Sequence, residues 1–204
     1  MNIQSQNTMS DHFDQLERQR SPYLLKSLIL QDPQRMQSQD WKFFISKNDT
    51  GVILNRGRQG AKDGGRVIWQ HLINFTKPHN FSSKLYPCYI DSEIAKSEWC
   101  SKGIHLGSGH DHVFHLLNFA LKNRIKNFLI LNFDAHADMR QDNLLHSGTP
   151  FRFFFNQHKK EIEHYQLQQI GLNIFHQNPQ DLELAGAKVE VFWSKESGFD
   201  RIKQ

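Results

Sequence analysis

The chain has 204 residues, of which 38% are hydrophobic and 23% are charged. This length allows one domain with a substantial core, and the mixture of both charges excludes a wholly disordered chain. The net charge is +4, but Lys and Arg are scattered and form no basic stripe, which argues against nucleic-acid binding.

Cysteine usage and hydropathy indicate where the protein works. Cys88 and Cys100 are the only two cysteines and have no metal or redox spacing, which favours a reducing compartment over a disulfide framework. No apolar run approaches the roughly 18 residues of a membrane span, and the N-terminus lacks the apolar core of a secretory signal. We therefore expect a cytoplasmic protein that does not contact membranes.

The first 40 residues are rich in Gln, Ser, Asp and Arg and predict a loosely attached arm with one short helix between Pro22 and Gln31. Residues 41–204 are expected to form the folded domain. Trp41–Ser46 has the bulky apolar content of a buried strand. Asn48–Gly65 is then expected as a Gly-rich loop, but it lacks the spacing of a nucleotide-binding P-loop.

The middle of the chain alternates between helical and strand patterns. Helical spacing in residues 65–75 predicts an apolar face made by Val67, Ile68, His71, Leu72 and Phe75. Leu85–Ile90 is expected as a strand, and Pro87 favours an edge position. Residues 103–112 are expected as a loop. The next helix, over 112–127, has an apolar face of Val113, Leu116, Leu117, Ala120, Leu121 and Ile125.

Phe128–Phe133 is the strongest predicted strand, and its continuous apolar run suggests a central strand covered on both faces. A helix with Pro150 in its first turn, a strand over 167–172, a short helix capped by Asn178 and a strand over 188–193 follow. Strands alternating with helices predict an α/β fold with a mainly parallel sheet and right-handed crossovers.

Three potential metal ligands follow the predicted central strand in "FDAHADMR". Asp134, His136 and Asp138 stand where α/β sheets gather functional groups, and an extended backbone would point all three to one side. Two carboxylates and one imidazole suit Mn²⁺, Fe²⁺ or Zn²⁺. The same residues are open to a plainer interpretation, in which an Asp caps a helix and the His is structural.

A further ligand must come from another strand end, and "GSGHDH" supplies His110. Gly107 and Gly109 would allow the backbone to approach a site closely. A His-rich zinc motif of the form H-x-H-x-D-H fails here, because Phe114 stands where Asp is needed. His112 and His115 are expected at the surface or in packing.

Four segments together resemble the ureohydrolase family of arginase, agmatinase and formimidoylglutamase. They are "GVILNRGRQGA" (51–61), "GSGHD" (107–111), "NFDAHADMR" (132–140) and "SGTPFR" (147–152). Their order matches that of the family, and the resemblance extends from about Trp41 to Trp193. It implies a three-layer α/β/α fold of the arginase type.

The resemblance also implies a centre of two Mn²⁺ ions, which lower the pKa of a water that attacks a guanidinium or amidine carbon. Asp134 would contact both ions, His110 and Asp138 would bind one ion, and His136 would bind the other. Asp138 would also accept a hydrogen bond from the nucleophile. Asp111 would orient His110 or the helix that follows it.

"DAHADMR" followed by "SGTPFR" is most similar to formimidoylglutamase, whose reaction is N-formimidoyl-L-glutamate + H₂O → L-glutamate + formamide, a step of histidine degradation. We expect Arg140, Ser147 and Gly148 to bind the substrate, because Arg grips carboxylates in a bidentate manner. In agmatinase-like sequences a His occupies the position of Ser147, where it can act as an acid near the leaving amine. His146 lies one residue earlier, so this role cannot be transferred to it by position. Arg140 as a structural ion-pair partner and agmatine or arginine as the substrate stay open as alternatives.

The family's later S-x-D-x-D motif is not found, because the chain after "KVEVFW" reads "SKESGFDRIKQ" and contains Asp200 alone. We therefore expect a domain that is incomplete at its C-terminus, lacks the final strands and binds metal partially or weakly. Little or no activity is expected from this chain alone. A non-catalytic remnant, a homo-oligomer, or assembly with a partner that carries the missing motif are the remaining hypotheses.

Overall fold

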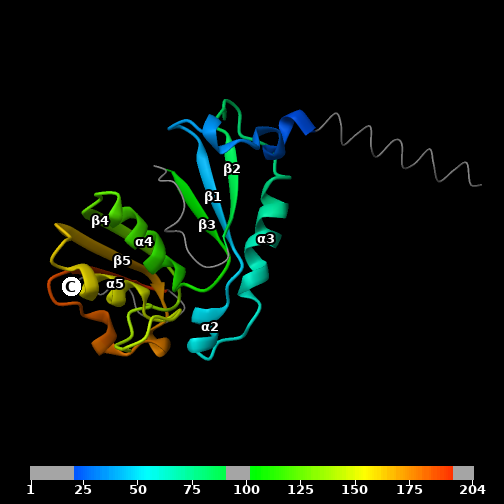
Figure 1. Cartoon of the computed structure of the whole chain (residues 1–204). Coiled ribbons are helices and arrows are strands. Elements are labelled where there is room, and N and C mark those ends of the chain that lie inside the picture. The colour runs from blue at the N-terminus through cyan, green and yellow to red at the C-terminus, as the bar shows by residue number, and fades with distance from the viewer. Residues whose placement is uncertain (1–20, 91–101, 195–204) are drawn as a thin grey trace, which may run out of the picture. The chain divides into compact units, whose positions relative to one another are not determined.

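The computed structural model describes residues 21–90 and 102–194, which form two compact units. Residues 21–47, 63–90 and 102–107 belong to unit 1, and residues 48–62 and 108–194 belong to unit 2 (Figure 1). The first half of the expected N-terminal arm, Cys100 and Asp200 lie outside the described residues.

Unit 1 is built on a three-stranded parallel sheet with the order β2-β1-β3. Its strands are β1 (Trp41–Ser46), β2 (Leu85–Ile90) and β3 (Gly103–Leu106). The bounds of β1 and β2 match the predicted strands, and Pro87 lies in an edge strand as expected. The prediction of a loop over 103–112 is wrong for its first residues, which form β3. This short segment is a strand because its backbone hydrogen-bonds to β1.

Helix α3 (Ala61–Leu72) packs on this sheet through only part of the predicted face, of which Leu72 contacts the core. Its Trp69 is buried, and its ring lies 4.9 Å from the ring of Phe43. Val67 and Ile68, which were expected in the core, are exposed. Gly65 explains the choice of face, because an added Cβ would lie 2.4 Å from the carbonyl oxygen of Leu106 and close approach requires glycine.

The segment before β1 is packed against unit 1 rather than loosely attached. It forms the short 3₁₀ helices η1 (Ser21–Tyr23), η2 (Leu25–Leu28) and η3 (Pro33–Arg35) in place of the predicted helix over 22–31. The N–H of Leu25 donates to the carbonyl of Phe75 (2.9 Å), and the N–H of Leu30 donates to that of Leu85 (2.9 Å). Leu28 is buried in the core of the unit.

The predicted Gly-rich loop is more ordered than its composition suggests. It contains helix α2 (Thr50–Leu54) and the start of α3. The buried carboxylate of Asp49 accepts hydrogen bonds from the N–H groups of Gly60 (2.9 Å) and Lys62 (2.7 Å). These two bonds close the loop onto the start of α2.

Unit 2 has a second three-stranded parallel sheet with the order β4-β5-β6. The strands are β4 (Asn127–Phe133), β5 (His164–Leu172) and β6 (Lys188–Trp193), and the parallel α/β class is as predicted. Helices α4 (His112–Lys122) and α5 (Pro150–His158) pack on one face of this sheet. The 3₁₀ helices η5 (Ile174–His176) and η6 (Pro179–Leu182) join β5 to β6, and Asn178 caps η6 as expected.

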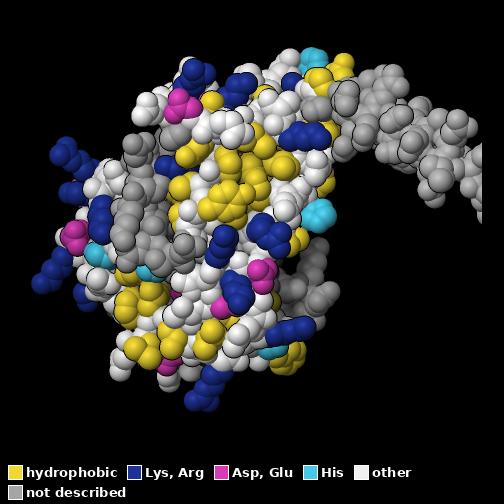
Figure 2. Space-filling view, turned by 45° about the vertical axis from the view of Figure 1, so that its right-hand side comes forward, with side chains coloured by type: hydrophobic (Ala, Val, Ile, Leu, Met, Phe, Trp, Pro, Cys, Tyr) yellow, Lys and Arg dark blue, Asp and Glu magenta, His cyan; other side chains and the backbone are white. Residues whose placement is uncertain are grey.

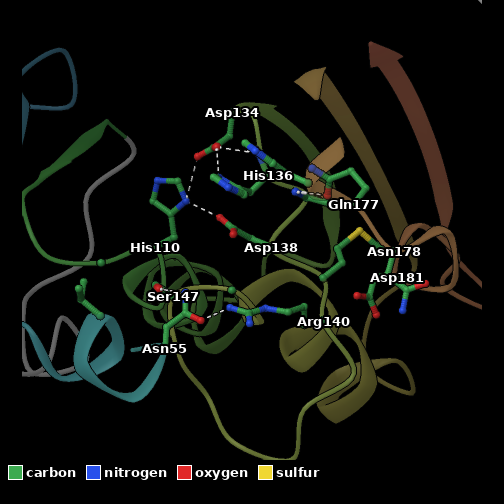
Figure 3. A pocket seen from close by; sticks show the side chains of 16 residues that line it. Asn55, His110, Asp134, His136, Asp138, Arg140, Ser147, Gln177, Asn178 and Asp181 are labelled. Atoms are coloured by element: carbon green, nitrogen blue, oxygen red, sulfur yellow. Dashed lines mark hydrogen bonds and ion pairs between the residues drawn. The ribbon is translucent and has the colours of Figure 1, made fainter. Parts of the chain in front are cut away.

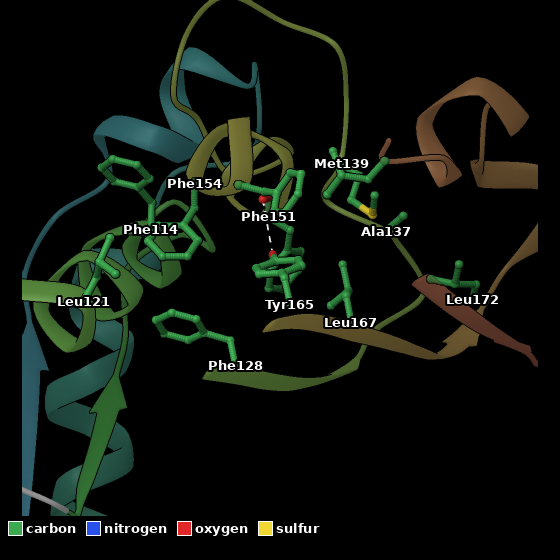
Figure 4. Packing of buried hydrophobic residues seen from close by; sticks show 12 residues of the cluster. Phe114, Leu121, Phe128, Ala137, Met139, Phe151, Phe154, Tyr165, Leu167 and Leu172 are labelled. Carbon is green, nitrogen blue, oxygen red and sulfur yellow. Dashed lines mark hydrogen bonds between the residues drawn. The ribbon is translucent and has the colours of Figure 1, made fainter. Parts of the chain in front are cut away.

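The core of unit 2 is rich in phenylalanine (Figure 4). Phe154 from α5 is fully buried, and its ring lies 5.3 Å from that of Phe128 in β4. Phe114 from α4 meets the same ring of Phe154 at 6.3 Å. These edge-to-face contacts join both helices to the sheet.

β4 is an edge strand, which corrects the prediction of a central strand covered on both faces. Leu129, Leu131 and Phe133 are 65%, 50% and 74% exposed, whereas Phe128 is buried. The reason is that α4 and α5 pack on the same face, so alternate residues of the strand point away from both helices.

The helix lengths and the surface charges of the described residues bear on two of the expectations. None of their helices is long and apolar enough to cross a membrane. Lys and Arg side chains are spread over the face visible in Figure 2 and do not gather in one patch.

Candidate metal centre

The D-x-H-x-D run leaves the carboxyl end of β4 as a turn, not as the extended segment that its spacing suggested. The carboxylate of Asp134 accepts a hydrogen bond from the N–H of His136 (2.8 Å), which bends the chain immediately after the strand. Asp138 has a φ of 51°, in the left-handed region that few residues other than glycine adopt. The two aspartates are therefore presented by a bent backbone.

His110 comes from the loop that precedes α4 and meets these aspartates (Figure 3). Its Nδ1 forms a hydrogen bond with Oδ2 of Asp138 and lies 3.3 Å from Oδ2 of Asp134. The Nδ1 of His136 lies 3.2 Å from the other oxygen of Asp134. Asp134 thus stands between the two imidazoles and faces each of them with a different carboxylate oxygen.

The donor atoms of His110, Asp134 and Asp138 all lie within 4.8 Å of one another, which is compact enough for one metal ion. Two carboxylates with one imidazole form a ligand set that suits divalent cations such as Mn²⁺, Fe²⁺ or Zn²⁺. His136 lies beside this group on the far side of Asp134. Its ring stacks on His176, with centroids 5.2 Å apart and planes inclined by 8°.

The electrostatics of the cluster favour positive charge at its centre. The hydrogen bond that His110 donates to Asp138 raises the pKa of His110, and burial opposes that rise. Burial raises the pKa of Asp138, and the hydrogen bond to His110 opposes that rise. The buried carboxylate is thus stabilised by a cationic neighbour, and a metal ion can fill that role.

Asp111 is buried next to His110 but points into the protein. A Cβ on Gly51 would lie 1.9 Å from its Cγ, and one on Gly109 would lie 2.5 Å from its Oδ1, so both glycines make room for this side chain. Burial raises the pKa of Asp111. Its Oδ1 has no hydrogen-bond partner in the described part of the chain, and its Oδ2 lies 4.0 Å from Nε2 of His112.

His112 lies in the interior, which is one of the two locations expected for it, at the surface or in packing. It is 2% exposed, and burial lowers its pKa to about 4. It is therefore neutral at physiological pH.

Arg140, Ser147 and Gly148 lie with the four predicted ligands in one cleft of about 720 Å³. The guanidinium of Arg140 donates a hydrogen bond to Oδ1 of Asn55, and Nδ2 of Asn55 donates to Oγ of Ser147 (2.7 Å). The N–H of Arg140 donates to the carbonyl of Gly148 (3.0 Å). Asn55 was not assigned from the sequence, although it stands inside one of the four segments that carry the family resemblance.

His146 does not line the cleft, and both of its ring nitrogens have partners. Nε2 lies 2.8 Å from Oδ2 of Asp142, and Nδ1 accepts a hydrogen bond from the N–H of Gly148 (3.1 Å). The ring is buried and supports the Gly148 turn.

Other polar side chains that pattern analysis passed over hold the backbone around the cleft. Arg152, which ends the "SGTPFR" segment, donates from Nε to the carbonyl of Met139 (2.6 Å) and from Nη2 to that of Glu183 (2.7 Å). Gln169 and Gln177 hydrogen-bond to the turn that carries the ligands. Gln169 stands opposite Asn132 in the β4–β5 register, and two facing amides in apolar strands are the signal that could have found this pair.

Comparison with known proteins supports the family that these residues indicate. The sequence model of the arginase family matches residues 91–203, which is more than half of the chain. Over 120 residues the chain is 30% identical to a formimidoylglutamase of Chromobacterium violaceum, covering 50% of this chain and 38% of that protein. Over 180 residues it is 28% identical to a formimidoylglutamase of Photorhabdus laumondii, covering 76% of this chain and 55% of that protein.

Among solved structures, the fold is similar to that of Trypanosoma cruzi formiminoglutamase with Mn²⁺, with a TM-score of 0.68 and 21% identity. The likeness covers 85% of this chain and 65% of that one. The chain spans about half the length of the curated relatives that it matches. From the family match and the arginase-type fold, we conclude that this chain belongs to the arginase family.

Proposed function

We propose that His110, Asp134, His136 and Asp138 hold Mn²⁺ and that the chain takes part in the hydrolysis of N-formimidoyl-L-glutamate to L-glutamate and formamide. The observation that carries the proposal is the convergence of three donor atoms within 4.8 Å beside Arg140 in one cleft. Residues 41–204 would then form part of a ureohydrolase domain.

The position of Asp134 supports two ions rather than one. Its Oδ2 lies 3.3 Å from Nδ1 of His110, and its Oδ1 lies 3.2 Å from Nδ1 of His136. A carboxylate with one oxygen toward each imidazole is suited to contact two ions at once. His110 and Asp138 would complete one ligand set, and His136 would belong to the other.

When bound, divalent ions supply Lewis acidity and lower the pKa of the attacking water. The carboxylate of Asp138 is placed to accept a hydrogen bond from that water, which would orient it toward the planar amidine carbon. Breaking the C–N bond then releases L-glutamate as the amine and formamide as the second product. Arg140 and Ser147, which line the cleft, would hold the substrate in position.

Arg140 supports an anionic substrate over a cationic one. Its guanidinium lies in the cleft and is held in place by Asn55, so the positive charge is fixed near the ligands. A dicarboxylate would pair with it, whereas the guanidinium of arginine or agmatine would be repelled. The hydroxyl of Ser147, which also lines the cleft, would offer a further polar contact.

Slow turnover is expected from the chain by itself. Of the described residues, Asp134 and His136 alone are placed to hold a second ion, and two protein ligands bind a divalent metal weakly. We expect a turnover below about 1 s⁻¹, a rate at the low end for enzymes.

Metal binding and product analysis test the proposal. Titration with Mn²⁺, followed by electron paramagnetic resonance of the free ion, should show binding to the wild-type chain and to the exposed control Asp63→Ala, but not to Asp138→Ala. Incubation with formimidoylglutamate should then release formamide slowly. Absence of Mn²⁺ binding would refute the proposal, and release of urea from agmatine or arginine without formamide release would refute the assigned substrate.

A further inference from the structure

Two glutamine side chains and one asparagine hold the backbone of the turn that carries the ligands. Gln169 is fully buried in β5, and its Nε2 donates to the carbonyl of Ala137 (2.7 Å). Its Oε1 accepts a hydrogen bond from Nδ2 of Asn132 (2.8 Å). The same Nδ2 of Asn132 lies 3.2 Å from the carbonyl of His136, so the two amides hold successive peptide groups.

Gln177 approaches the turn from the segment after β5. Its Nε2 donates to the carbonyl of Ala135 (2.7 Å), and its Oε1 accepts from the N–H of Ala137 (3.1 Å). A second contact of the Nε2, with the carbonyl of Asn173 (3.2 Å), anchors Gln177 to its own loop. Figure 3 shows this side chain next to His136.

These bonds fix the peptide groups on both sides of His136. A turn that breaks away from a strand has no ladder to satisfy its backbone groups, and side-chain amides are one way to satisfy them. Because Asp138 follows with a left-handed φ, a small rotation at Ala137 would swing its carboxylate away from His110. The amide contacts therefore restrict the direction of two predicted ligands.

We propose that Gln169 and Gln177 are positioning residues, an amide clamp that holds His136 and Asp138 ready for metal. The inference rests on the proposed metal site, although the clamp itself is a property of the described chain. If a glutamine only satisfied the hydrogen bonds of its own buried amide, replacing it would change the stability of the fold and nothing else. A clamp should also set the metal affinity, because groups that orient metal ligands commonly change affinity by about 10- to 100-fold.

The test replaces Gln177 with Met, which has a similar length and cannot make either hydrogen bond. Gln168→Met is the matched control, because Gln168 is the neighbour of Gln169 on the other face of β5 and donates to Glu190 (2.8 Å). Amide hydrogen exchange at Ala137 measures the clamp without metal. Titration with Mn²⁺ measures its consequence for the site. The same two measurements are made on Gln169→Leu, which changes the buried glutamine of the clamp. The melting temperature is recorded for each protein.

In Gln177→Met we expect exchange at Ala137 to rise about tenfold or more and the Kd for Mn²⁺ to rise about tenfold, with little change in melting temperature. Gln168→Met should match the wild type in both. Unchanged exchange, or faster exchange with an unchanged Kd, would overturn the proposal. If the wild type bound no Mn²⁺, the proposed function would fail, and exchange at Ala137 alone would decide whether the clamp exists.

Discussion

The guanidinium of Arg140 fills the space in which a side chain at position 148 would lie. A Cβ on Gly148 would be 2.3 Å from Nη2 and 2.6 Å from Nε of Arg140, while the N–H of Arg140 donates to the carbonyl of Gly148. Glycine at 148 is therefore a condition for the observed direction of the arginine. The two residues, eight positions apart, form one structural unit in the cleft.

Gly148→Ala should displace the guanidinium and leave the fold intact, because the atoms that clash are the far end of a flexible side chain. A charge-assisted hydrogen bond contributes about 1.5–3 kcal/mol, so we expect the affinity for L-glutamate to fall at least about tenfold. Isothermal titration calorimetry on both proteins measures this. Equal affinities would show that Arg140 does not bind the carboxylates.

His146→Leu should destabilise unit 2, because the buried N–H of Gly148 loses its acceptor. An unsatisfied buried donor costs about 1–3 kcal/mol, which urea titration would record as a lower free energy of unfolding. Asp142→Ala is the control, since its side chain is 51% exposed and such a pair contributes about 1 kcal/mol or less. Equal losses in the two variants would contradict a structural role for Nδ1.

Two adjacent glycines of α3 should respond oppositely to alanine. At Gly64 an added Cβ meets nothing within 4 Å, and Gly→Ala in a helix stabilises by about 0.5–1 kcal/mol. At Gly65 the Cβ would lie 2.4 Å from the carbonyl oxygen of Leu106, so the helix must move away at a cost of about 1–3 kcal/mol. Melting temperatures should therefore rise for Gly64→Ala and fall for Gly65→Ala. A rise in both would contradict the close packing of α3 on unit 1.

Leucines on the two faces of the unit 2 sheet should differ in their contributions to stability. Leu167→Ala removes a fully buried side chain and should lower the free energy of unfolding by about 2–5 kcal/mol. Leu131→Ala removes one that is 50% exposed and should change it by about 0.5 kcal/mol or less. Urea titrations of both variants provide the comparison. A loss at Leu131 equal to that at Leu167 would show that the outer face is covered in solution.

Local sequence patterns were enough to find the principal elements and the segments that carry the proposed ligands. The strands Trp41–Ser46, Leu85–Ile90 and Lys188–Trp193 have the predicted bounds, because short bulky apolar runs between turn residues favour strands wherever they are buried. The D-x-H-x-D run was recognisable because a polar triplet directly after an apolar strand is unusual. His110 followed from the glycines before it.

Tertiary contacts decided the remainder. The packing of α4 and α5 decides which face of β4 is covered. The pattern of apolar residues within β4 does not indicate that face. The bend at Asp134, the hold of Gln169 on Ala137 and the contact of Asn55 with Arg140 join residues as far as 85 positions apart. The sequence by itself thus indicated the candidate ligand types and the strand end that carries them. Only the fold determined their direction, because hydrogen bonds between distant segments set the backbone of the turn.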